Sequence, residues 1–132
     1  MDFQYAAKFI CGLARDEGSP VATGRYSTVV NVHNPGAETQ EFQYKLALAQ
    51  PGDNGNVSDF GGTKIKSDGA MYFDCKFVRD KFSVSDLLID GFFVIESKEF
   101  PLDVIAVYTT SSVDGRGVPA IEVERVSERR IS

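Results

Sequence analysis

The chain has 132 residues and a formal net charge of −5; 42% of its residues are hydrophobic and 25% are charged. This length and composition are typical of one globular domain and exclude an intrinsically disordered chain. The acidic balance argues against a nucleic-acid-binding protein, because such proteins need a basic surface that neutralises phosphates.

Turn-forming residues divide the chain into short runs rich in Val, Ile, Thr, Phe and Tyr, a pattern typical of an all-β sandwich or barrel. The run at 40–49 alternates as a half-buried strand does, with Phe42 and Tyr44 on one side and Gln43 and Lys45 on the other. We predict a single domain over residues 1–132, an immunoglobulin-like antiparallel β-sandwich of seven or eight strands with one short helical turn at most. The expected strands cover residues 4–12, 24–33, 40–49, 62–67, 70–76, 91–98, 101–111 and 118–126.

The stretch 77–90 interrupts this strand rhythm. Ser85 is a residue type that caps helices, so we expect a short helical turn through 86–88 inside a crossover loop. Asp74 and Asp103 each stand between two residues with apolar or sulfur-containing side chains. We expect each of these carboxylates to lie on an outward strand face or to cap a turn.

The runs at 91–98 and 101–111 carry apolar residues on both faces, which is unusual for strands of an isolated sandwich. The simplest cover for the second face is another copy of the chain. The alternative is a central pair of strands that is covered by the domain's own loops. The sequence therefore predicts self-association through an aromatic-rich sheet face, with the candidate interface residues Phe92, Val94, Ile105, Val107 and Tyr108.

His33 is the only histidine, and it stands at the end of a β-branched run, directly before Asn34-Pro35-Gly36. Nucleophilic catalysis needs a base beside a nucleophile, and the GxSxG motif is absent from the sequence. We therefore interpret His33 as a partly exposed residue at a strand end. No catalytic residue is predicted, and the chain is not expected to be an enzyme.

Metal and ligand sites have few candidate residues. One histidine and two distant cysteines are too few for zinc, and no cofactor is expected. The loop 51–60 offers oxygen donors, so Asp53, Asn56 and Asp59 are calcium candidates, but Gly55 stands where an EF-hand needs a side-chain ligand. A flexible polar hairpin loop is the favoured interpretation. A small-ligand or carbohydrate-binding module that uses these three residues and Tyr108 is the alternative function.

Cys11 and Cys75 leave two alternatives, which also bear on the compartment. They are either two buried, inert thiols or one disulfide between two strands, and a disulfide implies an oxidising compartment. The N-terminal residues contain no basic segment of the kind that opens a signal peptide. The protein is thus expected to be cytoplasmic as the sequence stands, extracellular if a signal peptide has been removed, and not inserted in a membrane.

Six motifs occur in order over most of the chain: YAAKFICG at 5–12, NVHNP at 31–35, DC at 74–75, GFFVIES at 91–97, LDVIAVYT at 102–109 and IEVERV at 121–126. Together they resemble an uncharacterised family of small bacterial β-sandwich proteins with the pattern YAAKF-CG, NVHNP, DC, GFVVIES and LDV-AVYT. This resemblance implies no activity. Both cysteines recur in the pattern, which implies that Cys11 and Cys75 lie close together.

A looser similarity of layout, carried by residues 30–36, Phe73-Asp74 and 93–107, is to the sensory rhodopsin transducer family. That similarity implies an oligomeric sandwich with a binding or signalling role. The expected function is therefore a non-enzymatic interaction or structural module whose partner is another copy of itself, with a different protein as the alternative partner. The resemblance does not imply binding to DNA or to rhodopsin for this acidic chain.

Overall fold

The computed structural model describes residues 1–15, 18–114 and 120–131. Within these residues it has ten strands and one α-helix, and all strand pairs are antiparallel. The all-β class is confirmed. In chain order the elements are β1 (Phe3–Ala14), β2 (Gly24–His33), β3 (Gln40–Gln50), β4 (Asp53–Val57), β5 (Gly61–Ile65), β6 (Ala70–Phe73), α1 (Cys75–Phe82), β7 (Leu88–Ser97), β8 (Asp103–Ser111), β9 (Ala120–Arg125) and β10 (Arg129–Arg130).

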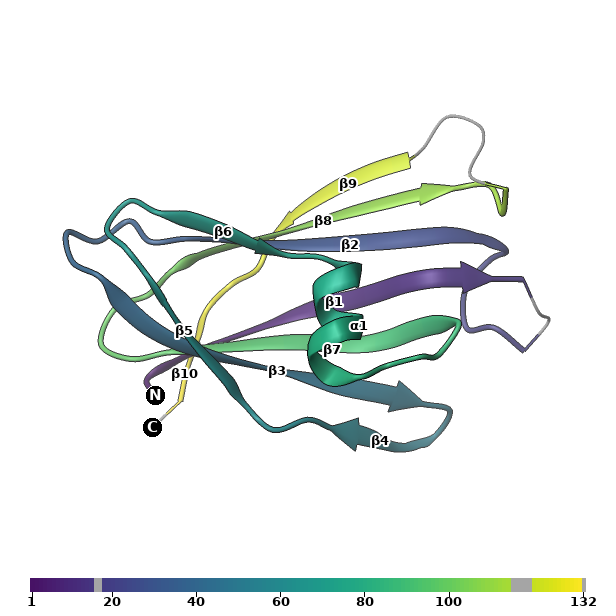
Figure 1. Ribbon diagram of the computed structural model, residues 1–132, viewed down its shortest axis with the longest axis horizontal. Coiled ribbons are helices and arrows are strands. Elements are labelled where there is room, and N and C mark those ends of the chain that lie inside the picture. Colours follow the sequence, from purple (N-terminus) through teal and green to yellow (C-terminus); the bar gives the residue numbers. More distant parts are fainter. Residues whose placement is uncertain (16–17, 115–119, 132) are drawn as a thin grey trace.

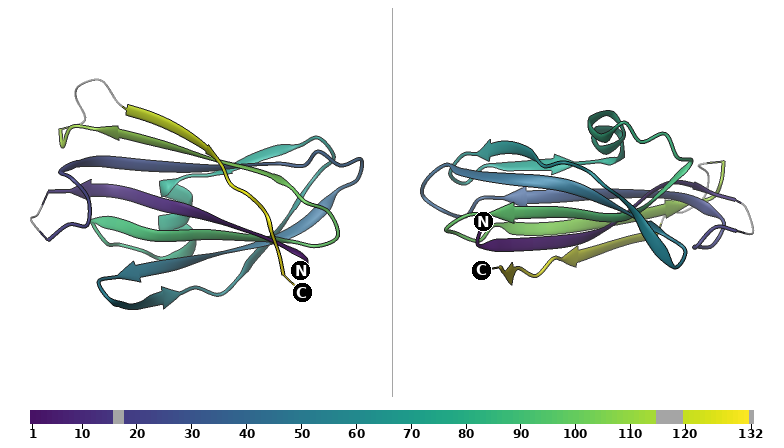
Figure 2. Two further views of the ribbon diagram at one scale, coloured as in Figure 1. Left: turned by 180° about the vertical axis from the view of Figure 1, so that it is seen from behind. Right: turned by 90° about the horizontal axis from the view of Figure 1, so that it is seen from below.

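The long strands form one continuous ladder in the order β4-β3-β7-β1-β2-β8-β9. Three short strands pair off this path, β5 with β3, β6 with β2 and β10 with β1. In Figure 1, β5, β6 and α1 lie in front of the long strands, so the molecule has two layers with the core between them. The segment after β9 crosses the sheet on the side away from α1 (Figure 2) and brings the C-terminus beside the N-terminus, where Ile131 N donates to Asp2 O.

Strand alternation explains which side chains fill the core. Along β1, Phe3, Tyr5, Ala7 and Phe9 are all buried, while the intervening residues face away from the core. On the layer in front, Val78 of α1 is completely buried against the same core. Burial of each large apolar side chain contributes about 1.5–3 kcal/mol, so this interior dominates the stability of the fold.

An aromatic cluster forms the centre of the core, under α1. Tyr44 stacks on Phe93 with ring centroids 5.7 Å apart, and Phe73 lies 5.0 Å from Phe93. The helix adds Phe77, 5.0 Å from Phe73, and Phe82, 6.2 Å from Tyr44. The helix is therefore held in place by aromatic contacts to two different strands, β3 and β6.

The helix differs from the prediction for this segment. It has eight residues and starts at Cys75, whereas we expected a strand to reach residue 76 and a single turn after Ser85. Asp74 determines the start, because its side chain accepts a hydrogen bond from Phe77 N at 2.8 Å as an N-cap. Of the two roles expected for Asp74, an outward strand face or a cap, the structure shows a cap, at the start of α1.

Among the described residues, no helix is long and apolar enough to cross a membrane.

Two further strands were not expected. β4 was predicted as a polar loop, but it pairs with the last residues of β3 and widens the sheet at that edge. β10 is two residues long and pairs with the start of β1. These two strands, added to the eight expected ranges, account for ten strands where seven or eight were predicted.

Cys11 and Cys75 form a disulfide, with their Cα atoms 5.8 Å apart. Of the two alternatives that the sequence left open, the structure thus has the disulfide, although it joins a strand to the first residue of α1 and not to another strand. The bond pins one end of the helix to β1. It closes the chain across a separation of 64 residues and so restricts the unfolded chain strongly.

β1 and β2 pair over only three residues and then diverge, and side chains bridge the gap between them. Thr28 Oγ1 donates to Ile10 O at 2.7 Å and accepts from Ile10 N at 2.9 Å, fully shielded from solvent. Further along, the hydroxyl of Tyr108 donates to Lys8 O at 2.8 Å. These side chains replace the missing backbone ladder, so the backbone groups of Ile10 and Lys8 keep hydrogen-bond partners.

Candidate functional site

His33 ends β2, as predicted, and both of its ring nitrogens contact carboxylates. Nδ1 lies 2.9 Å from Asp103 Oδ2, and Nε2 lies 2.8 Å from Asp68 Oδ1. Hydrogen bonds to Asp103 and then to Asp68 raise the pKa of His33 above its ordinary value. The His33 ring therefore links the start of β8 to the connection between β5 and β6, and both of its nitrogens are engaged by carboxylates.

The calcium candidates do not gather into a site. Asp53 and Asn56 lie in the exposed strand β4 and not in a loop, and Asp53 Oδ1 accepts a hydrogen bond from Asn54 N at 2.7 Å. Within the described parts of the chain, no three His, Cys, Asp or Glu side chains are placed to hold a metal ion.

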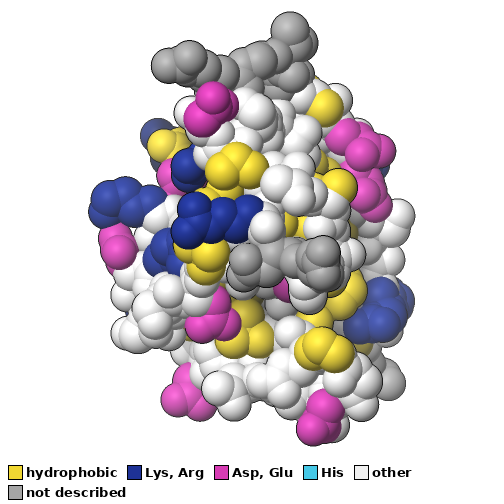
Figure 3. Space-filling view, turned by 90° about the vertical axis from the view of Figure 1, so that its right-hand side faces the viewer, with side chains coloured by type: hydrophobic (Ala, Val, Ile, Leu, Met, Phe, Trp, Pro, Cys, Tyr) yellow, Lys and Arg dark blue, Asp and Glu magenta, His cyan; other side chains and the backbone are white. Residues whose placement is uncertain are grey.

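Figure 3 views the right-hand end of Figure 1, where hydrophobic side chains are scattered among charged and other groups.

The predicted interface residues divide between different parts of the sheet. Phe92 and Val94 lie on the face of β7 that points away from the core. Val94 is only 7% exposed within the single chain, flanked by Ala6 and Lys45, so it is not available to a partner. Phe92 is 43% exposed, and Lys8 Nζ lies 5.3 Å from the centre of its ring.

Tyr108 lies on the other side of β8 and bridges to Lys8, so it is a structural residue and not part of an exposed face. Its burial, with Glu124 and Glu122 nearby, raises its pKa to about 12. The hydroxyl therefore stays protonated over the physiological range and keeps its hydrogen bond.

Ile105 and Val107 remain half-buried on the outer face of β8, where neighbouring strands extend an apolar surface. We define the aliphatic face by its five side chains: Val29 of β2, Ile105 and Val107 of β8, and Ile121 and Val123 of β9. Ile121 is 67% exposed and Val123 is 63% exposed. Register places Val29, Val107 and Val123 side by side across three strands.

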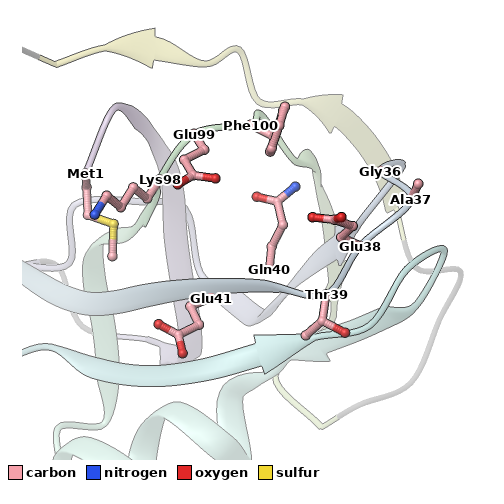
Figure 4. A pocket seen from close by; sticks show the side chains of 10 residues that line it. All are labelled: Met1, Gly36, Ala37, Glu38, Thr39, Gln40, Glu41, Lys98, Glu99 and Phe100. Carbon is pink, nitrogen blue, oxygen red and sulfur yellow. The ribbon is translucent and has the colours of Figure 1, made fainter.

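A second candidate site lies at the end of the sheet where β2 ends and β3 begins. It is a cavity of about 600 Å³ between the turn 36–41 and the connection 98–100, with Met1 at its edge. Figure 4 shows the Gln40 side chain reaching into it between Glu38 and Glu99. Asp53, Asn56 and Asp59 do not line this cavity, and β4 runs alongside the other end of β3, so this is not the ligand site that the sequence suggested.

Asn34 shapes the wall of this cavity. It is fully buried, and its Nδ2 donates to Glu38 O at 2.8 Å and Ile65 O at 3.1 Å. Its Oδ1 accepts from Gly36 N at 2.9 Å and Gln40 Nε2 at 3.3 Å. The Asn-Pro-Gly turn recognised in the sequence is thus fixed by one side chain, which also orients Gln40.

Sequence reasoning missed Ile121, Val123 and Gln40 as site residues. The alternation of Ile121 and Val123 with Glu122 and Glu124 was visible, but it did not reveal that this strand lies at an edge, with its apolar side uncovered. Gln40 resembled an ordinary polar residue at a strand start. Its importance depends on the loop 98–100, which is distant in the sequence.

No protein-family model and no curated protein sequence matches this chain. The crystal structure of Thermotoga maritima 1070 is similar in fold, with a TM-score of 0.61 at 10% sequence identity. The similarity covers 96% of this chain and 91% of that one. At this level of identity the shared feature is the fold of the whole domain.

Proposed function

We propose that this chain is a non-enzymatic interaction module on an immunoglobulin-like sandwich, and that it self-associates by covering its aliphatic face with a second copy. The observation that carries the proposal is the exposure of Ile121 and Val123 beside half-buried Val107 on one sheet face. β-branched side chains on a flat strand surface lose little entropy on burial. Such a contiguous apolar surface is typical of protein interfaces.

Charge supports a second copy as the occupant. Of the residues that face this side of β9, only Arg125 is charged, and it lies 3.4 Å from Asp103 at the border of the aliphatic face. Glu122 and Glu124 point to the other side, toward Tyr108. Two copies that pack face to face therefore bring valines and isoleucines together without opposing like charges.

Pairing through the free edge of β9 is less favourable than packing of the faces. An antiparallel β9–β9 contact centred on Val123 places Glu122 directly opposite Glu124 of the second copy. Like charges at that position destabilise a strand pair, and charged residues on edge strands commonly block such contacts. The geometry thus favours contact through the sheet face.

The environment of His33 supports the non-enzymatic part of the proposal. Its two nitrogens are engaged by Asp103 and Asp68, and the hydroxyl of nearby Ser67 donates to Gly36 O.

The disulfide favours an oxidising compartment, since cytosolic proteins rarely keep structural disulfides.

The test compares Val123→Lys with Val57→Lys by light scattering after size exclusion. Val57 is a valine of matched exposure, 61%, on β4 at the opposite edge of the sheet. We expect Val123→Lys to give monomer at concentrations where the wild type and Val57→Lys are oligomeric, because a lysine ammonium is costly to bury at an apolar contact. Equal oligomerisation of the two variants would contradict the proposal.

A further inference from the structure

The cavity between the turn 36–41 and the connection 98–100 is lined by a residue with a buried polar atom that has no hydrogen-bond partner among the described residues. Gln40 is 7% exposed, its Nε2 donates to Asn34 Oδ1, and its Oε1 makes no hydrogen bond to any of the residues that the structure describes. A buried amide oxygen without a donor costs free energy, so such atoms are rare in folded proteins. The unpaired oxygen therefore marks a point at the cavity wall where a donor is missing among the described residues.

Two carboxylates flank the Gln40 amide. In Figure 4, Glu38 approaches from the turn before β3 and Glu99 from the connection after β7, while Lys98 extends toward Met1 and away from Gln40. Within residues 1–15, 18–114 and 120–131, neither glutamate side chain is in a salt bridge. The space beside Gln40 therefore favours positive charge.

The backbone holds Glu99 in this position. Glu99 has a φ of 69°, a left-handed conformation that residues other than glycine seldom adopt. Its backbone N–H donates to Asp2 Oδ2 at 3.1 Å, and Phe100 N donates to Lys98 O at 2.8 Å across it. Phe100 follows with an exposed ring at the rim of the cavity, where an aromatic face attracts cations.

We propose that this cavity binds a small organic cation with N–H donors, an alkylammonium or guanidinium group. One N–H donates to Gln40 Oε1, the charge lies between the Glu38 and Glu99 carboxylates, and the hydrocarbon part contacts Phe100. A metal ion fits less well, because a cavity of about 600 Å³ is far larger than one ion needs. The cavity and the aliphatic face share no residue, so this inference goes beyond self-association and stands independently of it.

The test is a titration with butylammonium and with methylguanidinium, followed by ¹H–¹⁵N NMR on the intact chain at low ionic strength. We expect the side-chain amide of Gln40 and the backbone amides of 38–41 and 98–100 to shift with saturation. Tetramethylammonium, a cation without N–H donors, and butanol, an uncharged analogue, are expected to bind at least about tenfold more weakly, the scale of one charge-assisted hydrogen bond.

Three variants distinguish binding of the cation at this cavity from a general effect of the net charge of the chain. Glu99→Gln and Gln40→Met are each expected to weaken butylammonium binding about tenfold. Asp53→Asn removes the same charge from the exposed strand β4, which does not line the cavity, so binding should be unchanged. If Gln40→Met does not fold, the exposed Glu38→Gln replaces it.

Three results would overturn the inference. The first is the absence of saturable shifts at the cavity with either N–H cation. The second is binding of tetramethylammonium or butanol as tight as that of butylammonium. The third is an equal loss of affinity in Asp53→Asn and Glu99→Gln, because it would mean that net charge alone attracts the cation.

Discussion

At the scale of single residues, His33 shows how a candidate catalytic group becomes a structural one. Asp103 lies on β8 and Asp68 in the connection between β5 and β6, so His33 joins three separate segments through its ring. The sequence predicted its place at a strand end. It did not predict the two carboxylates, because they are 35 and 70 residues away along the chain.

This arrangement predicts a pH-dependent contribution of His33 to stability. Its pKa is raised in the folded state, so the stabilisation is fully present below the ordinary value of 6.5 and is lost as pH rises through the raised value. His33→Gln should therefore lower the melting temperature more at about pH 5.5 than at about pH 8.5. An equal loss of melting temperature at both pH values would contradict this prediction. In a chain that already carries Asp103→Asn, the difference between the losses at the two pH values should be smaller.

Tyr108 illustrates a second residue-scale role, the replacement of a missing backbone ladder. Tyr108→Phe removes the donor to Lys8 O and leaves that carbonyl without its partner, so we expect a loss of about 1–2 kcal/mol in the free energy of unfolding. Tyr72→Phe, at an exposed position of β6, is the matched control and should change it by less than about 0.5 kcal/mol. Denaturant titration of both variants measures this, and equal losses would show that Tyr108 has no special role.

At the scale of elements, α1 depends on its cap more than on its helix propensity. Asp74→Ala should cost about 1 kcal/mol, because Phe77 N loses its acceptor. Asp80→Ala, in the same helix, removes an exposed partner of Lys76 and should cost less than about 0.5 kcal/mol. Chemical denaturation distinguishes these values, and a larger effect of Asp80→Ala would contradict the assignment of Asp74 as the cap.

Elements with strong alternation were predictable, and elements that depend on a neighbour were not. β2 has the predicted ends, and β3 and β8 differ from their predicted ranges by only one or two residues at an end. The alternation in β3 shows one buried face, whereas β8 was recognised as an apolar run with β-branched residues on both faces. β4 contains Asp, Asn and Gly, residues typical of loops, and forms a strand because the end of β3 offers free backbone groups. The start of α1 was predicted as a strand, since Phe73 and Cys75 fit that pattern as well.

At the scale of the whole molecule, the disulfide connects the two layers. Reduction of Cys11–Cys75 should lower the free energy of unfolding by about 2–4 kcal/mol, because the unfolded chain regains the freedom that the crosslink removes. Thermal unfolding with and without reductant measures this loss. The double variant Cys11→Ala/Cys75→Ala should be insensitive to reductant, and a wild type equally insensitive would contradict the prediction.

Neither candidate site could be located from the sequence, because both are products of long-range packing. The aliphatic face combines β2, β8 and β9, and its exposure depends on β9 lying at the end of the ladder. Of the predicted interface residues, Ile105 and Val107 lie on the outer face of β8, whereas Val94 is covered within the chain and Tyr108 points the other way. The cavity around Gln40 likewise requires two loops that are about 60 residues apart.

The central claim, that the working form is an assembly of copies joined through the aliphatic face, is tested most directly by sedimentation velocity of the unmodified chain. The measurement runs from low micromolar to near-millimolar concentration. The account predicts that the sedimentation coefficient rises with concentration to that of a defined oligomer, and that Val123→Lys abolishes the rise. A single monomeric species across the whole range would contradict it.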